Sequence, residues 1–164
     1  MSAPMPLDRI LLYVDATEEA ISAARYAVAL AKRYGGQLTA VYVVNVGILQ
    51  ELFRARVFLE DEGAGMEQDL EDDGRDYLRY VEELGRAKGL LVLTEMRKGV
   101  VHAEVVNLAQ EMGATLIVLG EFEEPLSRRD ASYSESEMIL WRAPCPVAVV
   151  KGDDLATGLY DGLQ

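Results

Sequence analysis

Short apolar runs alternate with amphipathic segments along most of this chain of 164 residues. The runs have the length and composition of strands buried on both faces, and the segments between them repeat apolar residues every three or four positions, as one face of a helix does. This alternation predicts an α/β fold, an open five-stranded parallel sheet with helices on both faces. The expected strands are Arg9–Asp15, Gln37–Val44, Leu90–Met96, Thr115–Gly120 and Cys145–Lys151, and the expected helices are Glu18–Tyr34, Met66–Leu84, Val101–Met112 and Ser134–Arg142.

Two segments depart from this pattern. Asn45–Gly65 is a long link with apolar residues between Ile48 and Leu59, and a link of this length usually has a structure or a function of its own. We interpret it as a helical turn or lid near the carboxyl end of the sheet, or as an extension of a dimer surface. Gly152–Gln164 is polar and rich in glycine, so it is expected to be a mobile C-terminal tail. Residues 8–151 then form a single domain.

The charge and the cysteine content exclude several classes of partner. The formal net charge is −12, whereas nucleic acids and anionic membranes bind basic surfaces. The charge favours solubility, or a basic partner. Cys145 is the only cysteine, so no intrachain disulfide can form. The N-terminal residues do not resemble a signal peptide and no apolar run is long enough to span a membrane, which predicts a cytoplasmic protein.

The stretch from Thr115 to Lys151 bears most directly on function. A strand that ends at Gly120, a polar loop, a helix and a second strand form a βαβ unit, whose loop normally holds a phosphate at the helix N-terminus. Here the loop and the helix start carry four acids, Glu121, Glu123, Glu124 and Glu135, while Arg128 and Arg129 offset part of their charge. Because like charges repel more strongly as water is excluded, this loop disfavours a polyphosphate.

Four features together resemble the universal stress protein family over residues 8–151. They are the first strand with Asp15 at its end, the run Gly113–Gly120, the position of Ser134, and the run Ala143–Val147. The resemblance implies a Rossmann-like sheet with strand order 3-2-1-4-5, in which strands one and four meet at the topological switch point where such sheets bind ligands. It also implies a homodimer that pairs through the fifth strand, Val147–Lys151.

The same resemblance locates a degenerate nucleotide site. Nucleotide-binding members carry Gly, two residues, Gly, nine residues, then Gly followed by Ser or Thr; in this chain those positions are Gly120, Glu123, Tyr133 and Ser134. An acid and an aromatic ring therefore replace the two glycines that let the backbone approach phosphate. The family places Asp15 near the adenine, although Asp15 or Thr17 can equally cap the first helix. Ser134 and Ser136 are candidate phosphorylation sites, but the surrounding acids favour a helix cap.

The resulting prediction is a non-catalytic regulatory or interaction module of the stress response. It binds no ATP and no other cofactor, and it acts through an unidentified protein partner. The alternative is a member that binds ATP or AMP with weak or no hydrolysis. His102 has no nucleophile motif to serve and is expected near a helix cap or the surface, Cys145 is expected to be a buried thiol, and no Cys/His cluster suggests a metal. Neither catalysis nor a metal site is predicted.

Two other classes with a similar sheet fit less well. A phosphoacceptor receiver domain also has five parallel strands, but the third strand here ends in Thr94-Glu95-Met96 and lacks the acceptor aspartate. A dinucleotide dehydrogenase requires a glycine-rich loop after the first strand, and the residues after Val14 contain no glycine until Gly35.

Overall fold

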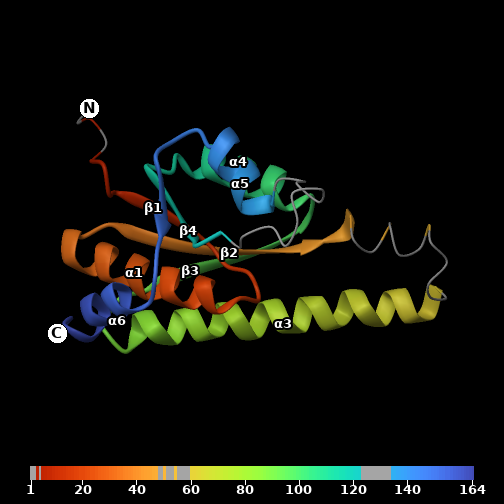
Figure 1. Ribbon diagram of the computed structural model, residues 1–164, viewed down its shortest axis with the longest axis horizontal. Coiled ribbons are helices and arrows are strands. Elements are labelled where there is room, and N and C mark those ends of the chain that lie inside the picture. Colours follow the sequence, from red (N-terminus) through yellow and green to blue (C-terminus); the bar gives the residue numbers. More distant parts are fainter. Residues whose placement is uncertain (1–2, 4, 48–49, 51–53, 55–59, 123–133) are drawn as a thin grey trace.

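The five expected strands form one parallel sheet of order β3-β2-β1-β4-β5 (Figure 1). The computed structural model describes residues 3, 5–47, 50, 54, 60–122 and 134–164. Every neighbouring pair of strands is parallel. The fold class and the strand order predicted from the sequence are confirmed. The strands are β1 (Arg9–Tyr13), β2 (Gln37–Asn45), β3 (Val92–Gly99), β4 (Leu116–Gly120) and β5 (Val147–Val150).

Helices cover both faces of the sheet. On one face lie α1 (Glu18–Tyr34), α3 (Glu60–Arg86) and α6 (Asp154–Asp161), and on the other lie α4 (Val101–Met112) and α5 (Glu135–Arg142) (Figure 1). Each face has its own apolar core because alternate residues of a strand point to opposite sides. Ile10 and Leu12 belong to the core under α1 and α3, whereas Leu11 belongs to the core under α4 and α5.

Helix α1 begins and ends as its sequence predicts. Thr17 is the N-cap, and its hydroxyl oxygen accepts a hydrogen bond from the amide of Ala20 at 3.2 Å. Gly35 ends the helix in the left-handed conformation, with φ of 73°, which glycine adopts without steric cost. The buried face is made largely of alanines, so the helix lies close to the sheet: Ala20, Ala23, Ala24, Ala27 and Ala31.

Helix α3 also lies close to the sheet, and glycines make this possible. A Cβ on Gly74 would lie 2.5 Å from Cδ1 of Tyr42, and one on Gly85 would lie 2.4 Å from Cγ2 of Val92. The amino-terminal part of α3 projects beyond the sheet (Figure 1). Lys98 on β3 forms ion pairs with Glu67 and Glu71 of this helix. No helix in the described part of the chain is both long enough and apolar enough to cross a membrane.

The C-terminal residues are not the mobile tail that the sequence predicted. Helix α6 packs on α1 and α3, and Ala156 is buried in the core. The hydroxyl of Tyr160 donates a hydrogen bond to the carbonyl of Leu84 at 2.8 Å, and Nζ of Lys88 lies 4.9 Å from the centre of the Tyr160 ring. Within Asn45–Gly65, residues 48–49, 51–53 and 55–59 lie outside the described residues, so the predicted lid or dimer surface is not seen. Asn45 ends β2, α3 begins at Glu60, and the described residues 46, 47, 50 and 54 between them are helical.

Candidate functional site

The carboxyl ends of β1 and β4 border a small crevice at the predicted switch point. Its volume is about 190 Å³. The structure brings Asp15, Gly120 and Ser134 together there, as predicted, whereas Glu123 and Tyr133 lie outside the described residues. The residues that line this switch-point crevice are Tyr13, Asp15, Thr17, Glu19, Ala20, Gly120, Glu121, Phe122, Ser134, Glu135 and Ser136.

Asp15 supports the cap of α1. Its Oδ1 accepts a hydrogen bond from the backbone amide of Thr17 at 3.1 Å and a second, short one from the Thr17 hydroxyl. Thr17 in turn accepts from the first turn of the helix. Asp15 therefore positions the capping residue, which gives this aspartate a structural role that needs no ligand.

Gly120 is required by packing between β4 and α1. A Cβ at this position would lie 2.8 Å from both the carbonyl carbon and the carbonyl oxygen of Glu19, and 3.1 Å from the amide nitrogen of Ala20. These are backbone atoms at the start of α1, so they cannot yield as the end of a flexible side chain can. The glycine at the first motif position thus has a reason to be there that is independent of phosphate.

Ser134 caps α5, which confirms the cap interpretation. Its Oγ accepts a hydrogen bond from the amide of Glu137 at 3.2 Å. The backbone of Ser134 is extended, as an N-cap residue requires. One of the amide donors at the N-terminus of α5 is therefore already satisfied within the protein.

Glu135 joins the starts of two helices. Helix α4 has Val100 at its N-cap position, which offers no side-chain acceptor. Oε2 of Glu135 takes that role from α5: it accepts from the backbone amide of His102 at 2.7 Å and lies 2.8 Å from Nδ1 of the same residue. The sequence separated His102 from the switch region, but only 16% of its side chain is exposed and it contacts a residue of the crevice. In the sequence, the one indication of this contact is Val100, which stands at the N-cap position of α4 and has no side-chain acceptor.

The electrostatics of the crevice oppose an anion. Four carboxylates line it, on Asp15, Glu19, Glu121 and Glu135, and none of the described lining residues is basic. Burial, followed by the charges of Asp15 and Glu135, raises the pKa of Tyr13 well above its usual range. A further negative charge in the crevice is therefore disfavoured, whether it arises by ionisation of Tyr13 or comes with a ligand.

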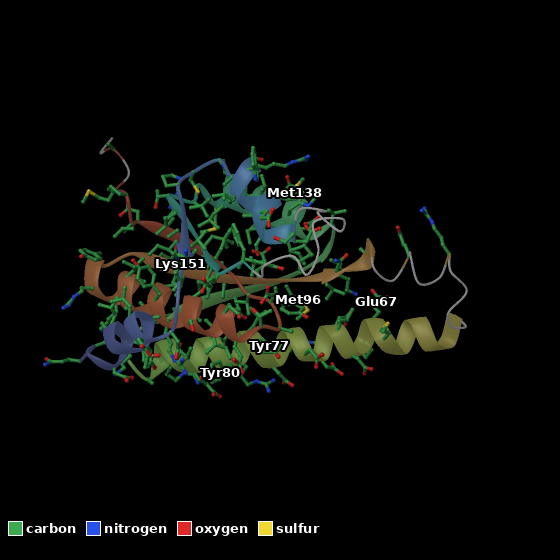
Figure 2. All side chains as sticks on the ribbon, viewed as in Figure 1. Glu67, Tyr77, Tyr80, Met96, Met138 and Lys151 are labelled. Carbon is green, nitrogen blue, oxygen red and sulfur yellow. The ribbon has the colours of Figure 1, made fainter. Side chains whose placement is uncertain are left out.

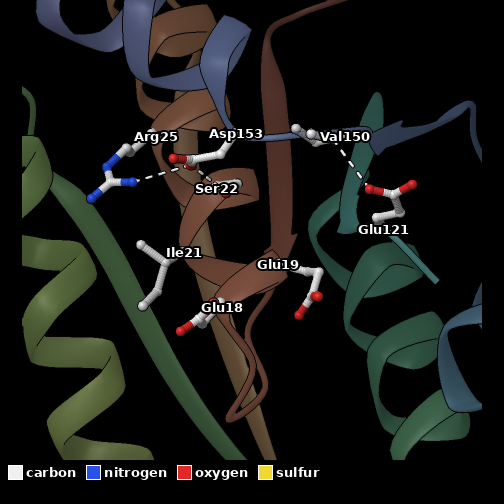
Figure 3. Close-up of a pocket in the computed structure, with 9 residues that line it drawn as sticks. Glu18, Glu19, Ile21, Ser22, Arg25, Glu121, Val150 and Asp153 are labelled. Carbon is white, nitrogen blue, oxygen red and sulfur yellow. Dashed lines mark hydrogen bonds and ion pairs between the residues drawn. The ribbon is translucent and has the colours of Figure 1, made fainter. Parts of the chain in front are cut away.

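A larger cavity adjoins the crevice and shares Glu19 and Glu121 with it. This cavity, between α1 and the end of β5, has a volume of about 410 Å³ (Figure 3). It is also acidic, with Glu18 and Asp153 in addition. Among the described residues that line it, Arg25 is the one basic residue, and its guanidinium lies 3.3 Å from the carboxylate of Asp153.

The described residues of this region offer neither a reactive thiol nor a metal-binding cluster. Cys145 is half-buried, less than the buried thiol that the sequence predicted. Burial is still the main cause that raises the pKa of its thiol, which keeps it protonated at neutral pH. Within the described ranges, no group of three or more His, Cys, Asp or Glu side chains is arranged to hold a metal ion. The acids of the crevice instead serve as hydrogen-bond acceptors for the helix starts and, through Glu121, for the amide of Gly152 at 3.2 Å.

Comparison with known proteins identifies the family to which this fold and crevice belong. The sequence profile of the universal stress protein family matches residues 6–151. The chain belongs to this family. Universal stress protein MJ0531 of Methanocaldococcus jannaschii is 30% identical over 145 residues, a stretch that covers 87% of this chain and 81% of the relative.

Solved structures of this universal stress protein's neighbours share its fold. The hypothetical protein MJ0577 superposes with a TM-score of 0.72 at 18% identity, over 92% of this chain and 99% of the other. A universal stress protein of Archaeoglobus fulgidus, solved in complex with dAMP, has a TM-score of 0.55 at 20% identity, over 90% of this chain and all of the other (100%). At these identities the likeness concerns the fold alone.

Proposed function

We propose that this universal stress protein is a non-catalytic regulatory or protein-interaction module that does not bind ATP. We group it with members that lack the glycine-rich motif, since Glu123 and Tyr133 occupy two of its glycine positions. The observation that carries the proposal is the lining of the switch-point crevice, where four carboxylates face the space and no described lining residue is basic.

Simple electrostatics indicates the size of the obstacle. At an effective dielectric constant of about 20, two like unit charges about 4 Å apart repel by about 4 kcal/mol. Micromolar affinity corresponds to about 8 kcal/mol of binding free energy. Two such unrelieved contacts between phosphate and carboxylate would therefore cancel a micromolar site.

One backbone donor at each of the three helix starts is also engaged. At the start of α1 the Thr17 side chain takes an amide, at the start of α5 Ser134 takes one, and at the start of α4 Glu135 takes one. An anion that used these three amides would have to displace their acceptors and break those hydrogen bonds. The crevice volume of about 190 Å³ also falls below the range of about 300–1,000 Å³ usual for ligand pockets.

The alternative is a nucleotide-binding universal stress protein with weak or no hydrolysis. The Archaeoglobus fulgidus protein was solved in complex with dAMP, and this supports the alternative. That nucleotide carries a single phosphate. A monophosphate meets less repulsion than a triphosphate, so any residual binding here should favour AMP-like ligands over ATP.

A thermal-shift titration tests both functions. With 1 mM ATP, with and without Mg²⁺, we expect the melting temperature to change by less than about 1 °C. A site with a Kd 100-fold below the ligand concentration would add about 2.7 kcal/mol, or roughly 5–10 °C, and such a rise would overturn the proposal. The same titration with dAMP tests the alternative.

A charge-removal variant tests the reason for exclusion. Glu121→Gln combined with Glu135→Gln halves the carboxylates of the crevice, and we expect it to bind adenine nucleotides more tightly than wild type. Glu83→Gln combined with Asp69→Asn is the matched control, because both residues are exposed on α3 and neither lines the crevice. Equal affinities of all three proteins would show that charge does not govern the site.

We further propose that the protein is a homodimer through β5. This strand pairs with β4 on one side only and lies at the edge of the sheet. Val147 and Val149 are only partly buried in one chain. An apolar edge strand left bare promotes association, which supports pairing with a second copy.

A further inference from the structure

A third cavity lies between α1 and α3 and shares no lining residue with the switch-point crevice. Its volume is about 360 Å³, and it is lined by Ile21 from α1 and by Asp73, Asp76, Tyr77 and Tyr80 from α3. Figure 2 labels Tyr77 and Tyr80 on the part of α3 that lies beside α1. We call this space the tyrosine cavity. Residues three and four apart on a helix share a face, which explains how Asp73, Asp76, Tyr77 and Tyr80 meet.

The lining combines two aromatic rings with two carboxylates. An aromatic face attracts a cation through its quadrupole, and a carboxylate attracts the same cation by charge. An anion would be repelled by both groups, and an uncharged apolar molecule would leave the carboxylates unpaired. A lining of this composition favours an organic cation over an anion or an uncharged apolar molecule.

One of the rings is held in place before any ligand arrives. Tyr77 stacks on Tyr42 of β2, with ring centres 6.5 Å apart and planes 8° from parallel. Gly74 lets α3 approach closely enough for this contact, since a Cβ there would meet the Tyr42 ring. A ring fixed in this way loses little conformational entropy when a ligand binds. Tyr80 is 38% exposed, so its ring borders the opening.

The carboxylates remain available for a cation. Among described residues, Asp73 makes no ion pair. Its negative charge is the second cause, next to burial, that raises the pKa of Tyr42. Asp76 pairs with Arg79 at 3.4 Å, but both side chains are more than 60% exposed, at 74% and 65%. Such a surface pair is worth little and can exchange for another cation.

We propose that the tyrosine cavity binds a small alkylammonium ion, either a quaternary or a primary amine. The net charge of −12 raises the local concentration of such cations around the protein. The site does not depend on the proposed function, since it lies outside the nucleotide crevice.

A titration of the ¹⁵N-labelled full-length chain followed by NMR tests the site. The probes are choline and propylammonium at constant ionic strength, and 3,3-dimethyl-1-butanol serves as the uncharged isostere of choline. We expect saturable shifts of the amides around Ile21, Tyr77 and Tyr80 with a cation and none with the isostere. Absence of saturation, equal shifts with sodium, or equal binding of the isostere would each overturn the proposal.

Matched substitutions separate the ring from the charge. Tyr80→Phe keeps the aromatic face and should retain the wild-type Kd, whereas Tyr80→Leu should weaken binding by about 2- to 30-fold. Asp73→Asn should also weaken it, but Asp72→Asn, which removes the same charge from the same helix outside the cavity, should not. Unchanged spectra elsewhere in the chain confirm that each variant is folded. Equal affinities of Tyr80→Leu and wild type, or equal losses for Asp72→Asn and Asp73→Asn, would contradict the site.

Discussion

Replacement of Gly120 by alanine distinguishes a residue kept for phosphate from a residue kept for packing. If Gly120 serves only the approach of a ligand, Gly120→Ala leaves the stability of the free protein unchanged. If the glycine is needed between β4 and α1, the added methyl must displace backbone. The structure favours the second outcome, since the new Cβ would lie 2.8 Å from the backbone carbonyl of Glu19.

The magnitude follows from that distance. Ordinary contacts begin at 3.4 Å, so the start of α1 must move by about 0.6 Å, the difference between 3.4 and 2.8 Å. Because the atoms are main chain and carry the Thr17 cap, the strain should cost about 1–3 kcal/mol, as other overpacking substitutions do. For a chain of this size, that lowers the melting temperature by roughly 2–12 °C.

Urea unfolding followed by circular dichroism measures the effect. We expect a lower midpoint for Gly120→Ala with an unchanged m-value, which indicates lost stability with no change in the denatured state. Gly65→Ala is the matched control: Gly65 lies in α3 with nothing within 4 Å of a new Cβ. There alanine should stabilise by up to about 1 kcal/mol through helix propensity. If Gly120→Ala proves as stable as wild type, the packing explanation is wrong and the glycine is free to serve a ligand.

Three further changes test other parts of the molecule. Val149→Lys places a charge on the edge strand β5 and should yield monomers, measured by light scattering coupled to size exclusion. Leu93→Lys, on the opposite edge strand β3, should remain dimeric. If both variants are dimers, pairing through β5 is refuted. Tyr160→Phe removes the hydrogen bond from α6 to α3 and should lower the free energy of unfolding by about 0.5–1.5 kcal/mol, and no loss would mean that α6 is held by apolar contacts alone. Hydrogen bonding from Ser22 is the first cause that lowers the pKa of Asp153. The ionised Asp153 therefore stabilises the folded state above its unfolded pKa, and this stabilisation is lost as pH falls through its folded pKa. Asp153→Asn should therefore flatten the fall in stability between neutral and acidic pH, measured by urea unfolding at several pH values, and an unchanged pH profile would contradict the assignment.

Periodicity in the sequence was enough to predict the sheet and most helices, because buried parallel strands and amphipathic helices leave different repeats. The caps at Thr17 and Ser134 were also readable, since capping depends on residues three positions apart. Helix α6 was missed although Ala156, Tyr160 and Leu163 have helical spacing. Three apolar residues in a short, glycine-rich segment give a weak signal, and packing on α1 supplies the stability that the segment lacks alone.

Individual side-chain contacts between elements distant in sequence could not be predicted. Glu135 and His102 are 33 positions apart, and each residue by itself looks like an ordinary polar side chain near a helix start. The tyrosine cavity could not be predicted for a different reason. Tyr77 packs against the core, and the apolar stripe of α3 alone does not show that Ile21 of another helix completes a space beside it.

The helix starts around the switch point support the proposal that this crevice excludes phosphate. In an open parallel sheet, α1, α4 and α5 all begin at the carboxyl edge, and each helix start offers unpaired amides that an anion can take. Here each start has an internal acceptor: Thr17 for α1, Glu135 for α4 and Ser134 for α5. Glu135 belongs to α5 but caps α4. Its carboxylate therefore occupies the place that an anion could take at the start of α4, and it holds α5 against α4. Under the proposed function, the carboxylate of Glu135 thus supplies at this edge the negative charge that a phosphate would otherwise bring.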